Sequence, residues 1–257
     1  MGCHFVTQLK IIILGFNNPT VIAETFSRFY QLTDTDNLNY ELIFVDCCYP
    51  LPDREQNKET FKQLCVAHSA TYMPLLRNYG QDGNYNKIFF QPWMTDDTLI
   101  LFFDPDNYPE KTSYLKSAIQ LQQETQAGYI TLHRHHPQFD MRTSQKQLQI
   151  SPSGIRYREL NFTGGWPMAL WSGSWILKMR PLIQSHSYYG GTEANIYEAL
   201  KRTNTPGLML EDFEDKMISA GCDKEYIIWK AIVINSEEHP DFEEWLDKYN
   251  LKYHLRR

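Results

Sequence analysis

Through the first 110 residues of this chain, short apolar runs alternate with segments whose apolar residues recur at helical spacing. Strands are predicted at 10–15, 40–45, 71–76 and 98–103, and helices at 21–32, 55–67 and 85–93. The segment Arg77–Asn86 is polar and contains Gly, so it is predicted to be a loop. Strand–helix alternation with short connections is typical of a mostly parallel sheet covered by helices. The sequence therefore predicts an α/β fold.

The second part of the chain is less regular. Helices are predicted at 112–125, 193–202 and 242–249, strands at 128–133 and within 225–235, a hairpin at 146–158, and a loop rich in Gly and Trp at 161–173. No repeat, low-complexity segment or linker interrupts the 257 residues, a length that supports one large α/β domain. We expect a single domain, 1–257, with two halves of about 1–110 and 111–257. The second half is expected to contain a smaller region with mixed strand directions.

The strand predicted at 98–103 ends in two spaced carboxylates, Asp104 and Asp106. Pro105 between them fixes its own φ and favours an extended Asp104, so the strand stops there. Ligands of open α/β sheets bind at the carboxyl ends of strands. Two carboxylates at this spacing suit a hard divalent cation, which in turn can hold a diphosphate. The alternative is a simple turn, because Asp, Pro and Asn all favour turns.

Composition excludes some classes of function. The formal net charge of −6 argues against a nucleic-acid partner, which usually meets a basic face. No apolar run is long enough to span a bilayer, and the first residues lack a secretory signal. The five cysteines are irregularly spaced, which favours reduced thiols. The sequence thus predicts a soluble, cytoplasmic protein without a transmembrane segment.

The order of these motifs resembles that of the GT-A glycosyltransferases, particularly the family-2-like group, over roughly residues 8–215. The matching segments, in chain order, are Ile11–Asn18, Phe44–Asp46, Arg77–Gly80, Gly83–Asn86, Asp104–Asp106, Asn161–Trp166 and Gly190–Asn195. The resemblance implies a GT-A-like, Rossmann-like fold, with residues 1–110 as the nucleotide-binding half and 111–257 as the acceptor side. It implies a hexosyltransferase that uses a nucleotide-diphosphate sugar, with a UDP-sugar the expected donor, and an unknown acceptor such as a glycan, lipid or protein.

The resemblance also implies roles for individual residues. Asp104 and Asp106 would hold Mn²⁺ or Mg²⁺. The residues expected to contact the nucleotide are Asn17, Asp46, Arg77, Asn86 and Asp104. Those expected to contact the sugar or the acceptor are Gly164, Gly165 and Trp166. The expected catalytic base is Glu193. Each has a plainer alternative: Asp46 could cap the turn after its strand, and Glu193 could be a favourable charge at a helix start.

One segment departs from the family pattern. The family places its catalytic base in a Glu-Asp pair, whereas Ala194 follows Glu193 here. Glu211-Asp212 and Glu214-Asp215 are further candidates for the base. The departure keeps open a non-catalytic protein that binds nucleotide or carbohydrate. A sugar nucleotidyltransferase is disfavoured, because the loop after the first strand has a single Gly and no basic residue.

Overall fold

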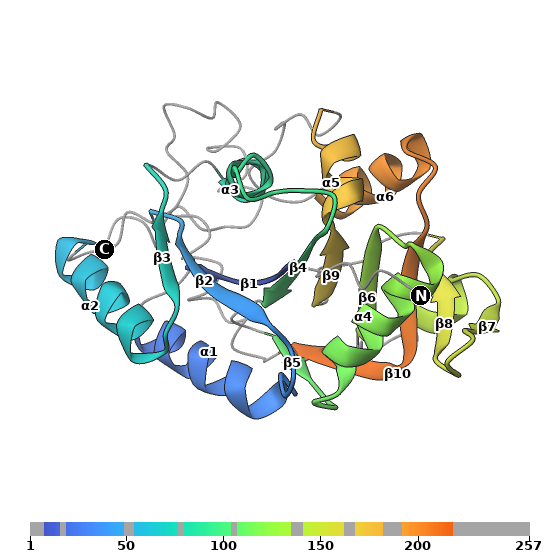
Figure 1. Ribbon diagram of the computed structural model, residues 1–257, viewed down its shortest axis with the longest axis horizontal. Coiled ribbons are helices and arrows are strands. Elements are labelled where there is room, and N and C mark those ends of the chain that lie inside the picture. The colour runs from blue at the N-terminus through green and yellow to red at the C-terminus, as the bar shows by residue number, and fades with distance from the viewer. Residues whose placement is uncertain are drawn as a thin grey trace, which may run out of the picture.

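The computed structural model describes residues 8–15, 19–48, 54–76, 80–103, 107–134, 141–161, 168–181 and 192–217. A ten-stranded mixed sheet runs through this part of the chain, with helices against both faces (Figure 1). The strands follow the order β3-β2-β1-β4-β9-β6-β10-β8-β7, and β5 pairs with β10.

The first four strands of this order form the parallel part of the sheet. They are β1 (Gln8–Gly15), β2 (Tyr40–Asp46), β3 (Thr71–Pro74) and β4 (Thr98–Phe103). β1 lies between β2 and β4 and is parallel to both. Consecutive side chains of β1 alternate between the two faces: Ile11 and Ile13 join one core cluster, and Ile12 and Leu14 the other. Both faces are therefore buried, as expected for a parallel sheet.

The rest of the sheet is mixed. It comprises β5 (Asn107–Pro109), β6 (Tyr129–Arg134), β7 (Leu148–Ile150), β8 (Arg156–Glu159), β9 (Ala169–Ser172) and β10 (Gly207–Met217). β9 lies between β4 and β6 and is antiparallel to both, so β6 keeps the direction of β4. β10 is parallel to β6 and antiparallel to β8 and β5.

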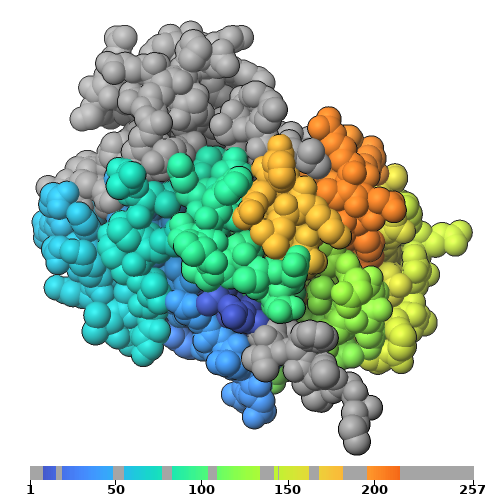
Figure 2. Space-filling view, turned by 45° about the horizontal axis from the view of Figure 1, so that its top comes forward, coloured from blue at the N-terminus to red at the C-terminus, as the bar shows by residue number. Residues whose placement is uncertain are grey.

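Within the described ranges, three α-helices lie against each face of the sheet. One face carries α1 (Pro19–Leu32), α2 (Arg54–Ala67) and α4 (Tyr114–Thr125), and the other carries α3 (Gly80–Phe89), α5 (Gly173–Met179) and α6 (Thr192–Arg202) (Figure 1). A short 3-10 helix, η1 (Met141–Ser144), precedes β7. Figure 2 shows the surfaces of α3, α5 and α6 adjoining one another on one side of the molecule.

The predicted fold class, a GT-A-like α/β sheet flanked by helices with a mixed second region, is confirmed. The segments predicted as helix at 21–32, 55–67, 112–125 and 193–202 match α1, α2, α4 and α6, and the hairpin at 146–158 matches β7 and β8. The segments predicted at 225–235 and 242–249 lie outside the described residues. No helix in the described part of the chain is long and apolar enough to cross a membrane.

Two predicted loops were wrong. Most of Arg77–Asn86 lies in α3, which begins at Gly80 and ends at Phe89, four residues before the predicted end at Trp93. Its polar residues concealed an apolar face on which Tyr85, Ile88 and Phe89 are buried. The predicted loop at 161–173 contains β9, whose four residues are all buried between two longer strands. Four residues are too few to show a periodic pattern of apolar residues in the sequence. Pairing with β4 and β6 is what specifies this strand.

Candidate active site

The carboxyl ends of β1, β2 and β4 meet at one edge of the sheet. Gly15 of β1 is paired with Asp46 of β2, and Ile13 of β1 with Phe103 of β4. The ends of three strands that are far apart in the sequence therefore lie side by side. This is the edge at which α/β sheets bind their ligands.

The predicted metal ligands Asp104 and Asp106 lie outside the described residues, but both flanking positions are described. β4 ends at Phe103, and β5 begins at Asn107, which is paired with Met217 at the end of β10. Phe103, the residue before the two aspartates, thus lies at the edge formed by β1, β2 and β4. Two aspartates offer only oxygen ligands, which suit Mg²⁺ or Mn²⁺. Among the described residues, no group of three or more His, Cys, Asp or Glu could hold a metal ion.

Asp46 is the predicted nucleotide contact that the structure describes most fully. Its side chain is almost fully buried. Oδ1 accepts a hydrogen bond from the backbone N–H of Cys48 at 3.0 Å, and Oδ2 accepts one from the Tyr72 hydroxyl at 2.6 Å. The backbone carbonyl of Asp46 accepts from the N–H of Leu75 at 2.9 Å. The carboxylate therefore caps the turn after β2 and ties β2 to β3, which is the structural role considered from the sequence.

The Tyr72 partner was not found by sequence analysis. β2 and β3 are paired so that Tyr72 lies opposite Phe44, two residues before Asp46, and the phenol reaches the carboxylate at the strand end. Nothing local in the sequence specifies this register. The same carboxylate also acts on a neighbouring thiol: burial raises the pKa of Cys65 to about 12, and the charge of Asp46 adds to the rise. Cys65 is consequently a neutral core residue at physiological pH.

Asn86 lies on α3, on the other face of the sheet from α1 and α2. Its side-chain oxygen Oδ1 is buried, and no hydrogen-bond donor within the described residues reaches it. A buried amide oxygen left unbonded costs free energy, so a donor is expected from an undescribed segment, water or ligand. The predicted nucleotide contacts Asn17 and Arg77 lie outside the described residues.

On the acceptor side, the predicted residues Gly164, Gly165 and Trp166 lie outside the described residues. The strand that follows them, β9, starts at Ala169, which is paired with Phe102 of β4. This pairing brings the described ends of the acceptor-side segment and of the two-aspartate segment to the same edge. Glu193 is the second residue of α6, within its first turn, and its side chain lies outside the described part.

The alternative acidic residues all lie on β10. The structure distinguishes three of them, and the side chain of Asp215 lies outside the described part. Glu211 receives two hydrogen bonds from Arg158, at 2.7 and 3.1 Å, and Asp212 is paired with Arg156 at 2.8 Å. These two carboxylates therefore hold β10 against β8. Glu214 instead follows an irregularity in the strand and lies opposite His133 of β6, at the carboxyl edge.

Comparison with known proteins agrees with this geometry. The family model described as glycosyl transferase family 2 matches residues 10–185, more than half of the chain. No curated protein sequence matches. Among solved structures, residues 1–349 of S. aureus TarS in complex with UDP superpose with a TM-score of 0.56 at 13% identity, over 88% of this chain and 64% of that one.

Two further solved structures are similar. GalNAc-T7 with UDP, GalNAc and Mn²⁺ has a TM-score of 0.61 at 8% identity, over 84% of this chain and 44% of that one. The mannosyltransferase PcManGT of Pyrobaculum calidifontis with GDP-Man and Mn²⁺ has a TM-score of 0.60 at 12% identity, over 87% of this chain and 60% of that one. This chain spans less than two thirds of the length of each. At such identities the likeness to these structures concerns the fold. The family match covers α1 to α5 and the strands β1, β2 and β4, and the chain belongs to glycosyl transferase family 2.

Proposed function

We propose that this protein is a metal-dependent glycosyltransferase that moves a sugar from a nucleotide-diphosphate donor, with UDP-sugar the expected donor, to an acceptor hydroxyl. The observation that carries the proposal is the meeting of β1, β2 and β4 at one edge, with the Asp104–Asp106 segment joined directly to β4. Family membership and the nucleotides bound by the similar structures, UDP in one and GDP-Man in another, support it.

In this proposal the nucleotide half of the site is built from loops at the carboxyl edge. Asp104 and Asp106 hold Mn²⁺ or Mg²⁺, which when bound neutralises charge on the leaving diphosphate. Asn17, Asp46, Arg77 and Asn86 surround the nucleotide. Asp46 acts from within a hydrogen-bonded turn, so it would be held in place before the donor binds.

On the acceptor side, Gly164 and Gly165 allow close approach of the backbone to the sugar, and Trp166 offers its ring face. Glu193 takes the proton from the acceptor hydroxyl. At the same time the acceptor oxygen forms a bond to the anomeric carbon of the donor sugar, and the bond between that carbon and the diphosphate breaks. Glu214 is the second candidate for the base, because it lies at the carboxyl edge, whereas Glu211 and Asp212 are engaged with arginines of β8.

Calorimetric titration of UDP and of GDP, each with Mn²⁺ and then with EDTA, tests the proposal. We expect one nucleotide to bind only with Mn²⁺, and Asp106→Ala to abolish that binding and donor turnover. Asp212→Asn is the matched control, because Asp212 is an acidic residue engaged in an ion pair with Arg156. Full donor hydrolysis and transfer in Asp106→Ala would refute the proposed metal site.

A second function, nucleotide or carbohydrate binding without catalysis, is favoured by one observation: Ala194 stands where an acidic residue is expected after Glu193. Donor binding without any turnover in the wild-type protein would support it. If turnover occurs, comparison of Glu193→Gln with Glu214→Gln identifies the base. The variant that removes the base should lower kcat by about 10²–10⁴-fold while leaving donor affinity unchanged.

A further inference from the structure

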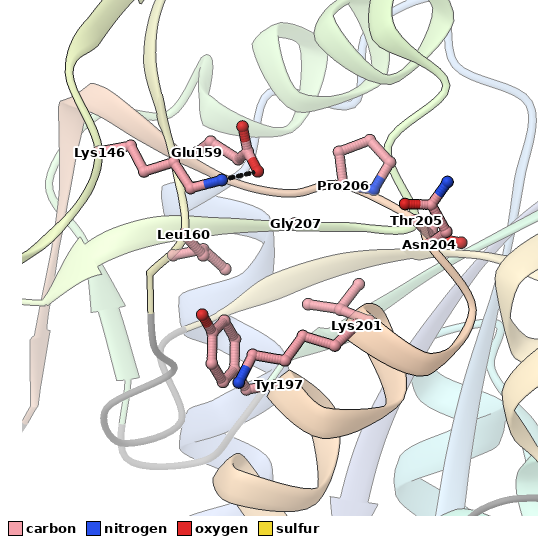
Figure 3. A pocket seen from close by; sticks show the side chains of 10 residues that line it. Lys146, Glu159, Leu160, Tyr197, Lys201, Asn204, Thr205, Pro206 and Gly207 are labelled. Atoms are coloured by element: carbon pink, nitrogen blue, oxygen red, sulfur yellow. Dashed lines mark hydrogen bonds and ion pairs between the residues drawn. The ribbon is translucent and has the colours of Figure 1, made fainter.

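A cavity of about 360 Å³ lies at the carboxyl end of α6 (Figure 3). It is lined by the last turns of α6, the turn that leads into β10, the end of β8 and Lys146 before β7. β10 begins here at Gly207, and since β10 runs parallel to β6, this is the sheet edge opposite to the one where β1, β2 and β4 end. Its volume is within the range of small-ligand sites.

The frame of this cavity is fixed by backbone hydrogen bonds. The N–H of Thr205 donates to the carbonyl of Leu200 at 3.0 Å, which closes the end of α6. The N–H of Leu160 donates to the carbonyl of Gly207 at 2.8 Å, which ties the end of β8 to the start of β10. Because both walls are held by main-chain bonds, the cavity is formed before any ligand arrives, which lowers the entropic cost of binding.

The floor of the cavity is apolar. Leu160 and Leu200 are both almost fully buried beneath it. A Cβ at Gly207 would lie 2.5 Å from Leu200 Cδ1, so glycine is what allows the two leucines to close the floor. Tyr197 is partly exposed and forms a side wall with its ring (Figure 3). An apolar floor with an aromatic wall suits the C–H face of a sugar.

The polar rim carries no unpaired charge. Lys146 is paired with Glu159, and Lys201 with Glu198 at 3.0 Å (the Lys201 ammonium also lies 4.3 Å from the centre of the Tyr197 ring). These pairs cancel the charge of the three ionised side chains that line the cavity, so nothing there favours a phosphate or another anion. Lysine and glutamate still provide donors and acceptors for hydroxyl groups.

The amide of Asn204 and the hydroxyl of Thr205 complete the rim. Asn204 has a left-handed backbone, φ +49°, and its N–H donates to the carbonyl of Lys201 at 3.1 Å. The residue is exposed and lines the cavity. An amide offers both a donor and an acceptor, which matches neighbouring hydroxyl groups of a sugar ring.

We propose that this cavity is a subsite for one neutral saccharide unit of the acceptor glycan. The proposal rests on the glycosyl transfer proposed above. Tyr197 and Lys201 follow Glu193 by four and eight residues of the same helix, about 6 and 12 Å along its axis. A glycan whose reacting hydroxyl lies at the start of α6 would extend along the helix and place a later unit in the cavity.

The test uses the full chain on an array of immobilised neutral and acidic oligosaccharides. We expect retention by at least one neutral glycan, and roughly tenfold weaker binding in Tyr197→Ala and in Asn204→Gly. Asn204→Gly removes the amide and keeps the left-handed backbone, so it carries the test if Tyr197→Ala fails to fold. Arg202→Ala, on the same helix and outside the cavity lining, should bind as the wild type does. Retention of acidic glycans alone, or of none, would overturn the assignment.

Nucleotide binding, measured in the same variants, separates this proposal from the proposed function. Tyr197→Ala and Asn204→Gly should bind UDP or GDP with Mn²⁺ as the wild type does, while glycan retention falls. If no nucleotide binds but neutral glycans are retained by the wild type and lost in the variants, the cavity binds glycans, and the transferase and the acceptor role of the cavity fail. If nucleotide binds and the two variants retain glycans unchanged, the subsite fails and the transferase stands.

Discussion

At the scale of single residues, the candidate site depends on how Asp46 is held. Tyr72→Phe removes the hydroxyl that donates to Asp46 Oδ2 and leaves a buried carboxylate with one bond fewer. We expect the free energy of unfolding to fall by about 1.5–3 kcal/mol, the range for a hydrogen bond to a charged group. Urea denaturation measures the change.

The control for this change is Tyr30→Phe. The Tyr30 hydroxyl donates to the carbonyl of His68 at 2.8 Å, but Tyr30 is exposed, and its partner is uncharged. Its loss should cost less than about 1 kcal/mol. Equal losses in the free energy of unfolding would mean that the bond from Tyr72 to the Asp46 carboxylate stabilises no more than an exposed, uncharged bond. The turn alone would then set the orientation of Asp46.

A second prediction at this scale concerns pH. Glu41 joins three strands, since it accepts hydrogen bonds from Lys10 of β1 at 2.6 Å and from Thr71 of β3 at 2.8 Å. The bond from Lys10 is the main cause that lowers the pKa of Glu41 below its ordinary value of 4.5. A lowered carboxyl pKa stabilises the fold fully above pH 4.5, and this contribution is lost as the pH falls through the folded pKa.

Glu41→Gln removes that titration. The variant should be less stable than the wild type at pH 7, and the difference should shrink as the pH falls below 4.5. Urea denaturation at several pH values measures it. Glu59→Gln, which breaks an exposed pair with Lys62 on α2, is the control and should change stability little at any pH. A constant difference between wild type and Glu41→Gln down to acid pH would contradict the prediction.

At the scale of elements, the join between β9 and α5 is the closest packed of the glycine positions that the structure describes. A Cβ at Gly173, the first residue of α5, would lie 2.0 Å from the backbone oxygen of Thr95, so either the helix or the 95–98 turn must move. We expect Gly173→Ala to destabilise the protein by about 1–3 kcal/mol, as overpacking does, and to lower the melting temperature. Circular dichroism during heating measures this.

Gly154 provides the comparison. It has φ +86° in the turn between β7 and β8, and a Cβ there would meet nothing within 4 Å. Alanine at this position is strained only in its own backbone, which costs about 1 kcal/mol. Gly154→Ala should therefore destabilise less than Gly173→Ala. The reverse order would show that the 95–98 turn yields easily and that the join is not a constraint.

At the scale of the whole molecule, the sheet crosses both halves of the chain. β9 is hydrogen-bonded to β4 of the first half and to β6 of the second, and Trp171 of β9 packs with Phe102 and Tyr129 from those strands. We predict that residues 1–257 unfold as one domain. Tryptophan fluorescence and far-ultraviolet circular dichroism should give coincident urea transitions. Two separated transitions would mean that the halves are independent domains.

The sequence by itself determined the α/β class, because the parallel strands and the amphipathic helices each bury a periodic set of apolar residues that can be read locally. It also marked Asp46 and the Asp104–Asp106 segment, since polar residues after buried strands are conspicuous. These signals depend on neighbouring residues in the chain, and so they survive without a structure.

Only the tertiary structure decided the rest. β9 is four residues long and is specified by β4 and β6, and the polar face of α3 concealed the side on which Ile88 and Phe89 are buried. Tyr72 and Asp46 are far apart in the chain but form a hydrogen bond. The cavity is likewise lined by residues of α6 and β8 that are distant in the sequence. Strand register and packing create such contacts, and no local pattern of residue types encodes them.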